Sequence, residues 1–564
     1  MAAGLVCLIA TSLTLLAVPQ VIRFAVDEVV GGASSTWRLL QLAGLLLGLA
    51  TTRSLARVLY RLLLFGASRR MERDIRRDFY EHVIRLPVQF FERRRIGDLM
   101  AISSNDIEAV RRLLGWGLLL TLDTLVMVAG AVFFMSDLSG EVTLYAFLPM
   151  AAASVFFMII GPRIKRLFRL VQESFAALTV DAEENITGVR VVRAYVQEEG
   201  EKSKFAVANN AHKAANMRMV TVDGLFQAVM ALLPSLPLAA ILLFGGPQVV
   251  RGQLSLGALL AIFLYAREMR WPIRFFGEMF NMIQRGRASV ARIWEVFREE
   301  VEFGGEVAPE RIEPLIRIRG LTFSYPGSAA RALDELTLQI DEGQTVALMG
   351  RTGAGKSTIL NLLLRLYDPP RGTVFLGGVD ILDIPKPELR ELCATAPQDA
   401  FLFTDSIRGN LSFTLEYPAE EELVRVAESV HLHDDIMQMP EKYATVVGER
   451  GVTLSGGQRQ RASLARAFLA GRAILLLDDP LSAVDTLTEA RILKAIDREQ
   501  DERTVLLVTN RVKAARLADR IVVLDKGRIV EQGAEEELLQ MGGVYAEIHQ
   551  RQQFGAEGAD KEQP

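Results

Sequence analysis

The chain has 564 residues, of which 50% are apolar and 23% are charged. This length allows several domains of about 100–200 residues each, and the mixed composition indicates a protein that is partly membrane-embedded and partly soluble. A net charge of −4 excludes a global field for nucleic-acid binding. The two cysteines, Cys7 and Cys393, exclude a disulfide framework or a cysteine-rich metal site.

Apolar runs in the first half of the chain approach the roughly 20 residues that cross a bilayer. Six such runs lie at residues 1–22, 38–60, 113–135, 142–160, 225–249 and 254–280. A signal peptide is the alternative for the first run, although the basic flank of such peptides is missing. Basic residues follow the second, fourth and sixth runs, so both chain ends are predicted to face the cytoplasm of a cell (plasma or inner) membrane.

Two long connectors on the predicted cytoplasmic side, residues 61–112 and 161–222, are charged and rich in helix formers. They predict helices that continue well beyond the bilayer. Each pattern is interrupted once, near Phe91 and near Asn185. A short exposed helix at each bend could touch a soluble domain.

Ionisable residues are also predicted within the bilayer: Arg53, Arg57 and Arg61 in the second run, and Glu268 and Arg270 in the sixth. Charges inside a membrane indicate a cavity or a transport pathway. Snorkelling to the interface is the favoured alternative for Arg57 and Arg61. Mutual pairing is the alternative for Glu268 and Arg270.

The second half of the chain reads as a soluble α/β domain. Hydropathy falls after Ile293, and short β-branched runs then alternate with amphipathic segments. The last residues are rich in Gly, Ala, Glu and Asp, which predicts disorder. The predicted organisation is a helical transmembrane domain at 1–297, a linker at 298–314, an α/β domain at 315–550 and a disordered tail at 551–564.

A glycine-rich turn lies inside this domain, between the apolar run 345–349 and the helix-like run 358–364. Strand, turn GRTGAGKS and helix in this order predict a phosphate-binding P-loop. Backbone N–H groups would surround the phosphates of ATP, Lys356 would neutralise them, and the Ser357 hydroxyl would bind Mg²⁺. The predicted ATP-binding residues are Gly350, Arg351, Thr352, Gly353, Ala354, Gly355, Lys356, Ser357 and Thr358.

Two further motifs follow. The apolar strand 473–477 ends in Asp478, a carboxylate suited to binding Mg²⁺. The sequence LSGGQ at 454–458 opens a helix, and such a turn at a helix N-terminus is a second phosphate site. Its predicted ligands are Ser455, Gly456, Gly457 and Gln458. One domain cannot place both turns on the same nucleotide, so two such domains are predicted to meet head to tail.

LSGGQ between a P-loop and a strand that ends in aspartate resembles the ATP-binding cassette (ABC) exporter family, over nearly the whole chain. Its half-transporters join six transmembrane helices to one α/β P-loop nucleotide-binding domain. The resemblance implies that Tyr325 stacks on adenine, although an aromatic there is more often part of a core. It implies that Gln398 is the Q-loop glutamine and a Mg²⁺ ligand, and that Asp485 belongs to the D-loop beside ATP. Residues 447–451 and the two bends would couple the domains.

Two positions depart from the family pattern. A glutamate usually follows the Walker B aspartate and polarises the attacking water, but here the residue is Asp479. Its carboxylate stands about 1 Å too far back, which can cost roughly a hundredfold in rate. The switch histidine is replaced by Asn510, which cannot carry a positive charge. We therefore expect this chain's own Walker site to bind ATP and to hydrolyse it poorly.

These residues predict the degenerate-site subunit of a heterodimeric, bacterial multidrug-type exporter for amphipathic drugs or lipids, driven by ATP and Mg²⁺. The partner would be a second half-transporter with Glu and His at these positions, whose competent site the LSGGQ turn completes. Membrane lipids are further predicted contacts, and nucleic acid is not. The alternatives are a homodimeric lipid or peptide exporter with slow hydrolysis, and an ATP-gated channel or regulator.

Overall fold

The computed structural model describes residues 2–32, 36–302, 304–305, 312–415, 418–448, 451, 453–482, 486–499 and 503–560. For some helical residues, Arg270 among them, only the backbone is described. Contacts divide the chain into two compact units. The helical unit comprises Met1–Ile84 and Ile96–Glu299, and the α/β unit comprises Arg85–Arg95 and Glu300–Pro564.

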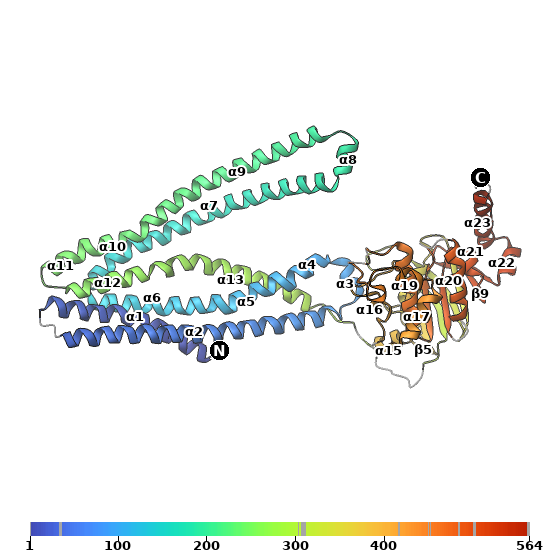
Figure 1. Ribbon diagram of the computed structural model, residues 1–564, viewed down its shortest axis with the longest axis horizontal. Coiled ribbons are helices and arrows are strands. Elements are labelled where there is room, and N and C mark those ends of the chain that lie inside the picture. Colours follow the sequence, from blue (N-terminus) through green and yellow to red (C-terminus); the bar gives the residue numbers. More distant parts are fainter. Residues whose placement is uncertain are drawn as a thin grey trace. The chain divides into compact units, whose positions relative to one another are not determined.

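Long helices build the helical unit (Figure 1). Its helices before the longest hairpin are α1 (Ala2–Val30), α2 (Thr36–Val83), α4 (Ile96–Ala101), η1 (Ile102–Asp106), α5 (Ile107–Arg112), η2 (Leu113–Gly117) and α6 (Leu118–Leu138). The remaining helices are α7 (Gly140–Thr187), α8 (Val189–Ala194), α9 (Glu198–Leu232), η3 (Leu233–Ser235), α10 (Leu236–Ala240), η4 (Ile241–Gly245), α11 (Gly246–Val250), α12 (Leu256–Glu268) and α13 (Arg270–Phe297).

The core of the helical unit joins α1, α6, α7 and α12. The fully buried Tyr265 donates its hydroxyl to the Leu16 carbonyl at 2.6 Å, and its ring stacks on Phe134 with centroids 5.8 Å apart. Gly130 lets α6 approach α1, because a Cβ there would stand 2.2 Å from Leu16 Cδ1. Small residues allow such close helix packing in membrane domains.

The two predicted bends coincide with short helices. Helix α8 follows the end of α7 and forms the tip of the α7–α9 hairpin (Figure 1). Its neighbourhood presents apolar side chains to solvent, including Val191, Tyr195 and Val196, the last 79% exposed. Helix α3 (Val88–Arg93) lies at the other bend. The expectation of a short helix near Phe91 and near Asn185 is thus confirmed.

Three helical segments of the described residues are long and apolar enough to cross a membrane: Ala3–Val30, Thr36–Val83 and Ile96–Leu138. They contain the first three predicted runs. The fifth run is divided near Pro234 and Pro237 into short helices, of which Leu236–Val250 is apolar. The sixth run is divided at Met269 between α12 and α13. The count of six spans therefore stays a prediction.

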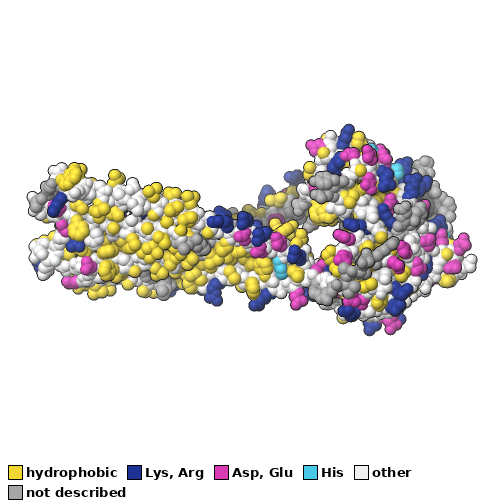
Figure 2. All heavy atoms as spheres, turned by 90° about the horizontal axis from the view of Figure 1, so that it is seen from below, with side chains coloured by type: hydrophobic (Ala, Val, Ile, Leu, Met, Phe, Trp, Pro, Cys, Tyr) yellow, Lys and Arg dark blue, Asp and Glu magenta, His cyan; other side chains and the backbone are white. Residues whose placement is uncertain are grey.

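The surface of the helical unit separates by polarity. Figure 2 shows hydrophobic side chains over much of its visible face, whereas Lys, Arg, Asp and Glu gather towards one end of the helices. Exposed apolar residues along α2, such as Leu47, Leu55 and Leu62, belong to this surface. A protein surface this apolar is suited to lipid rather than to water.

Two sheets form the α/β unit. The six-stranded sheet has the order β10-β9-β3-β8-β7-β6 and is parallel except for the antiparallel pair β9 and β10. The four-stranded sheet is antiparallel, with the order β2-β1-β4-β5. The strands are β1 (Ile316–Phe323), β2 (Leu333–Ile340), β3 (Thr345–Gly350), β4 (Val374–Leu376), β5 (Val379–Asp380), β6 (Cys393–Ala396), β7 (Ile474–Asp478), β8 (Thr504–Val508), β9 (Arg520–Asp525) and β10 (Arg528–Gly533).

Helices cover the six-stranded sheet, so β3 and β8 are buried along their whole length. Alternate residues of β3 enter different cores: Val346 and Leu348 pack with α14, whereas Ala347 and Met349 pack with α21 to α23. The helices are α14 (Lys356–Leu363), α15 (Lys386–Glu391), α16 (Ile407–Leu411), α17 (Glu420–Ser429), α18 (His433–Met437), η5 (Lys442–Ala444), α19 (Gly456–Leu469), α20 (Thr486–Glu499), α21 (Val512–Ala515), α22 (Glu535–Met541) and α23 (Val544–Asp560). The predicted α/β domain is confirmed.

Two predicted boundaries need correction. Residues 85–95 belong to the α/β unit rather than to the helical domain. The reason is packing: Phe90 of α3 is buried, and Glu92 accepts a hydrogen bond from the Tyr367 hydroxyl. The tail is not disordered from residue 551, because α23 continues to Asp560. Residues 561–564, and residues 303 and 306–311 of the predicted linker, lie outside the described residues.

Candidate functional site

The P-loop turn follows β3 at the carboxyl edge of the six-stranded sheet. Gly350, Gly353 and Gly355 have φ angles of +145°, +82° and +99°, which favour glycine. A Cβ on Gly350 would stand 2.2 Å from the Leu524 carbonyl oxygen. The turn therefore brings bare backbone to the N-terminus of α14, where N–H groups can surround an anion.

Lys356 opens α14 and is only 9% exposed. Its Nζ donates to the Gly350 carbonyl at 2.7 Å and to the Arg351 carbonyl at 3.1 Å. Burial lowers the pKa of Lys356, and the carboxylates of Asp479 and Asp478 oppose that shift. The ammonium thus lies inside the turn, and its neutralisation of phosphate stays a prediction.

Asp478 ends β7 beside this turn. Burial raises the pKa of Asp478, and a hydrogen bond with Ser357 and the charge of Lys356 oppose the shift. Ser357 and Asp478, two of the three predicted magnesium ligands, are thus in contact. A hydroxyl and a carboxylate suit Mg²⁺, which prefers oxygen donors and keeps water or phosphate in its other positions. Gln398 lies in an exposed loop after β6, the strand next to β7.

Asp479 follows with a φ of +46°, and its N–H donates to the Val508 carbonyl at 2.8 Å. Its Oδ1 is buried without a hydrogen-bond partner among the described atoms, so the residues present leave an acceptor for a water molecule or a ligand. The pKa of Asp479 is raised, chiefly by burial and also by the charge of Asp478. The positive charges of Arg511 and Lys356 oppose this shift.

Asn510 stands at the end of the neighbouring strand β8, exposed to solvent. Since β7 and β8 pair in parallel with Asp478 opposite Val508, Asp479 and Asn510 emerge at the same edge of the sheet. The structure thus brings both departures from the family pattern to the P-loop edge. Their effect on hydrolysis stays a prediction.

Tyr325 lies beside α14 with its ring half-buried. Its hydroxyl donates to Thr358 Oγ1 at 3.1 Å, and its ring meets that of Tyr367 edge to face at 4.9 Å. These contacts attach it to the core of the four-stranded sheet. Tyr325 is therefore next to the P-loop helix, and stacking on adenine stays a prediction.

Ser455 and Gly456 of the LSGGQ turn are exposed at the start of α19, whereas Leu454 is buried. Ser455 Oγ accepts from the Gln458 N–H at 3.2 Å, while Gln458 Oε1 accepts from the Ser455 N–H at 3.0 Å, which forms a capping box. Asp435 anchors this turn through Arg461 at 2.6 Å and Gln458 at 3.3 Å. The turn is thus held in one conformation, with Ser455 and Gly456 open to solvent.

Gln460 is a residue that the sequence reading missed. It is 4% exposed on α19, and its Nε2 donates to the Asp479 carbonyl and to Ser482 Oγ, both at 2.8 Å. It therefore ties the helix of the LSGGQ turn to the backbone of Asp479. The only sequence signal is a polar residue on the buried face of α19. Asp485, Ala483 and Val484 of the D-loop lie outside the described residues, as do Glu449 and Arg450.

Replacement of Gln460 by leucine should destabilise the α/β unit by about 0.5–1.5 kcal/mol, because the Asp479 carbonyl and the Ser482 hydroxyl lose the donor that the buried Gln460 supplies. Chemical unfolding of the full chain measures this. Gln460→Glu is the matched control, since it keeps the shape and can still accept from Ser482 but cannot donate to the Asp479 carbonyl. Equal stability of the leucine variant and the native chain would mean that the hydrogen bonds of Gln460 to Asp479 and Ser482 do not stabilise the fold.

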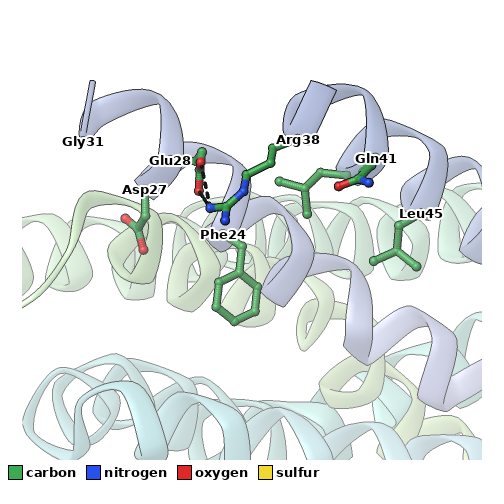
Figure 3. Close-up of a pocket in the computed structure, with 8 residues that line it drawn as sticks. Phe24, Asp27, Glu28, Gly31, Arg38, Gln41 and Leu45 are labelled. Atoms are coloured by element: carbon green, nitrogen blue, oxygen red, sulfur yellow. Dashed lines mark hydrogen bonds and ion pairs between the residues drawn. The ribbon is translucent and has the colours of Figure 1, made fainter. Parts of the chain in front are cut away.

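The helical unit contains a separate cavity of about 600 Å³. Phe24, Asp27, Glu28, Gly31, Arg38, Gln41, Leu42 and Leu45 of α1 and α2 and the turn after α1 line it (Figure 3). Arg38 and Glu28 pair at 3.3 Å, and Asp27 accepts from Ser255 Oγ and from the Gly257 N–H, each at 2.8 Å. The charges of Glu28, Arg38 and Asp27 in this cavity are thus largely paired or hydrogen-bonded.

The predicted intramembrane charges are only partly described. Arg53 Nε is buried without a hydrogen-bond partner among the described atoms, whereas Arg57 and Glu268 are exposed. Ser12 of α1 donates to Asp123 of α6 at 2.6 Å, a buried polar contact that the sequence reading missed. The side chain of Arg270 lies outside the described residues, so its pairing with Glu268 stays untested.

Known proteins match both units. Residues 1–273 match the ABC transporter transmembrane region, and residues 333–482 match the ABC transporter family. The chain is 34% identical to a probable multidrug resistance ABC transporter ATP-binding/permease protein, YheI of Bacillus subtilis (strain 168), over 98% of this chain and 95% of that protein.

Other relatives cover nearly the full length. The multidrug resistance-like ATP-binding protein MdlA of Escherichia coli (strain K12) is 34% identical over 95% of this chain and 92% of its own. The ATP-dependent lipid A-core flippase of Vibrio vulnificus (strain YJ016) is 30% identical over 98% and 95%. A solved structure of a bacterial Atm1-family ABC exporter with ATP bound aligns with a TM-score of 0.79 and 25% identity, over 98% of this chain and 97% of that one. The chain therefore belongs to the ABC transporter family, as an exporter that fuses a transmembrane domain to an ATP-binding domain.

Proposed function

We propose that this chain is the degenerate-site half of a heterodimeric exporter that moves amphipathic drugs or lipids across the cell membrane. The main support is a contrast, within one domain, between the LSGGQ turn and the two altered catalytic positions. The LSGGQ turn is capped and has Ser455 and Gly456 exposed, whereas Asp479 and Asn510 replace the catalytic glutamate and the switch histidine at the P-loop edge. One intact and one defective set of residues suit a pair of unequal ATP sites.

The Walker site of this chain would hold ATP through the P-loop backbone and Lys356, and Tyr325 would stack on the adenine. Bound Mg²⁺, held by Ser357, Asp478 and Gln398, would neutralise phosphate charge. Asp479 would orient water poorly, so hydrolysis at this site would be slow. Ser455 to Gln458, with Asp485 nearby, would complete the competent site of the partner.

Coupling to the membrane domain would use the two short helices α3 and α8. The apolar side chains around α8, such as Val191 and Val196, are exposed and need an apolar surface. We assign them to the ATP-binding domain of the partner half-transporter. Both chain ends and the α/β unit would face the cytoplasm, because basic residues follow the second, fourth and sixth apolar runs.

The substrates would be amphipathic because hydrophobic side chains dominate the helical unit and few charges enter it. The relatives support this class, since two are named for multidrug resistance and one for lipid A-core flipping. The positive charge of Arg53 would allow the cargo to carry an anionic group.

The test compares ATP turnover by the purified chain alone with turnover after co-expression with a half-transporter that carries Glu and His at the two positions. We expect negligible activity alone and robust activity in the pair, lost when the partner's glutamate is replaced by glutamine. Brisk turnover by the chain alone would instead favour a homodimeric exporter that uses Asp479.

A further inference from the structure

The C-terminal helix α23 contacts both loops that frame the nucleotide site. Gln552 Nε2 donates to the Asn510 carbonyl at 2.6 Å, and Gln552 Oε1 accepts from the Val512 N–H at 3.0 Å. One side-chain amide thus bonds to the backbone on both sides of Arg511. Two hydrogen bonds from one planar group fix the path of this switch loop.

A second contact reaches the P-loop. Glu547, one and a half turns before Gln552 on α23, pairs with Arg351 at 3.3 Å. Arg351 follows Gly350 in the turn whose carbonyls hold Lys356. The same helix therefore contacts the loop of Asn510 and the loop that would cradle the phosphates.

The start of α23 is anchored by buried contacts, so the helix can hold Gln552 in a fixed position. Tyr545 is fully buried, packs in one core with Met349 of β3 and Val512, and its N–H donates to Glu531 at 3.0 Å. The switch loop itself has two further supports: the Thr509 N–H donates to the Leu348 carbonyl at 3.1 Å, and Arg511 pairs with Glu489. Gln552 adds the support closest to Asn510.

We propose that Gln552 is a positioning residue for the ATP site, through which α23 holds the switch loop and Asn510 at the γ-phosphate. An uncharged asparagine contributes only one oriented hydrogen bond there, so its contribution depends on how little the loop moves. ADP lacks the γ-phosphate and gains nothing from this loop. Gln552 therefore discriminates ATP from ADP without touching either nucleotide. This inference rests on the proposed binding of ATP at the chain's own site.

The experiment uses the full chain in membranes with its partner half-transporter. The chain is photolabelled with azido-ATP at low temperature, and unmodified ATP or ADP is added to compete for the nucleotide site. The two half-transporters are separated on a gel so that only label on this chain is counted. For Gln552→Leu we expect ATP to compete about three- to tenfold less well, the effect of losing one or two solvent-exposed hydrogen bonds. Competition by ADP should change less than twofold.

Gln550→Leu is the matched control, since it makes the same change at an exposed position of α23 and should leave both competition curves unchanged. Gln552→Asn shortens the amide so that it cannot reach both partners, and it carries the test if leucine impairs folding. Equal loss of ATP and ADP competition, or an equal shift in Gln550→Leu, would overturn the proposal. Failure of the native chain to label would instead contradict the ATP-binding function itself.

Discussion

Replacement of Asp479 by glutamate should raise ATP hydrolysis at this chain's own site by about a hundredfold. The added methylene moves the carboxylate forward by about 1 Å, to the position from which it can orient the attacking water. The backbone at residue 479 cannot shift forward to compensate for the shorter side chain of aspartate. The Asp479 N–H is bonded to Val508, its carbonyl accepts from Gln460, and its φ is fixed at +46°. Single-turnover hydrolysis by the purified chain measures the gain.

Asp479→Asn is the control, because it keeps the length of aspartate and removes the charge, and we expect no gain from it. Asn510→His should add to the effect of glutamate by supplying a charged donor to the γ-phosphate. The two side chains end neighbouring strands, so their effects need not be additive. If Asp479→Glu and the native chain turn over at equal rates, the length of this carboxylate does not limit hydrolysis.

The sequence was sufficient where the chemistry is local. The P-loop, the LSGGQ turn and Asp478 each combine residue types with their strand or helix within about ten residues, so spacing alone placed them. The structure brings Ser357 to Asp478 and Lys356 into the turn, and their roles in binding Mg²⁺ and phosphate stay predictions. Parallel neighbours in a sheet carry their C-terminal loops to one edge, which is why distant motifs meet.

Contacts between residues that are distant in the sequence were not predictable. Gln460 and Asp479 are 19 residues apart, and Gln552 and Asn510 are 42 apart, with no periodic signal to join them. The tail was misjudged because its composition suggested disorder, although alanine, glutamate and glutamine favour helix. The placement of residues 85–95 depended on Tyr367 reaching Glu92, a contact 275 residues apart.

Ser455→Ala should lower transport by at least about tenfold, whereas Lys356→Ala should lower it by less than about threefold. Ser455 Oγ belongs to the turn that would complete the partner's competent site, so its loss weakens stabilisation of charge where hydrolysis occurs. Lys356 would serve a site that retains ATP and turns it over slowly. Substrate efflux and ATP turnover of the co-expressed pair, measured on the same preparations, give both ratios.

The Ser455 variant also loses a helix cap, which costs about 1 kcal/mol of stability by itself. Ser406→Ala separates the two effects, because Ser406 Oγ likewise accepts from the Gly409 N–H at 3.0 Å as the cap of α16, a helix that packs against α19 but contains no residue of the LSGGQ motif. We expect the Ser406 variant to lose similar stability and to retain transport. Equal losses of ATP turnover in Ser455→Ala and Lys356→Ala would mean that both sites hydrolyse ATP, and the asymmetric assignment would then be wrong.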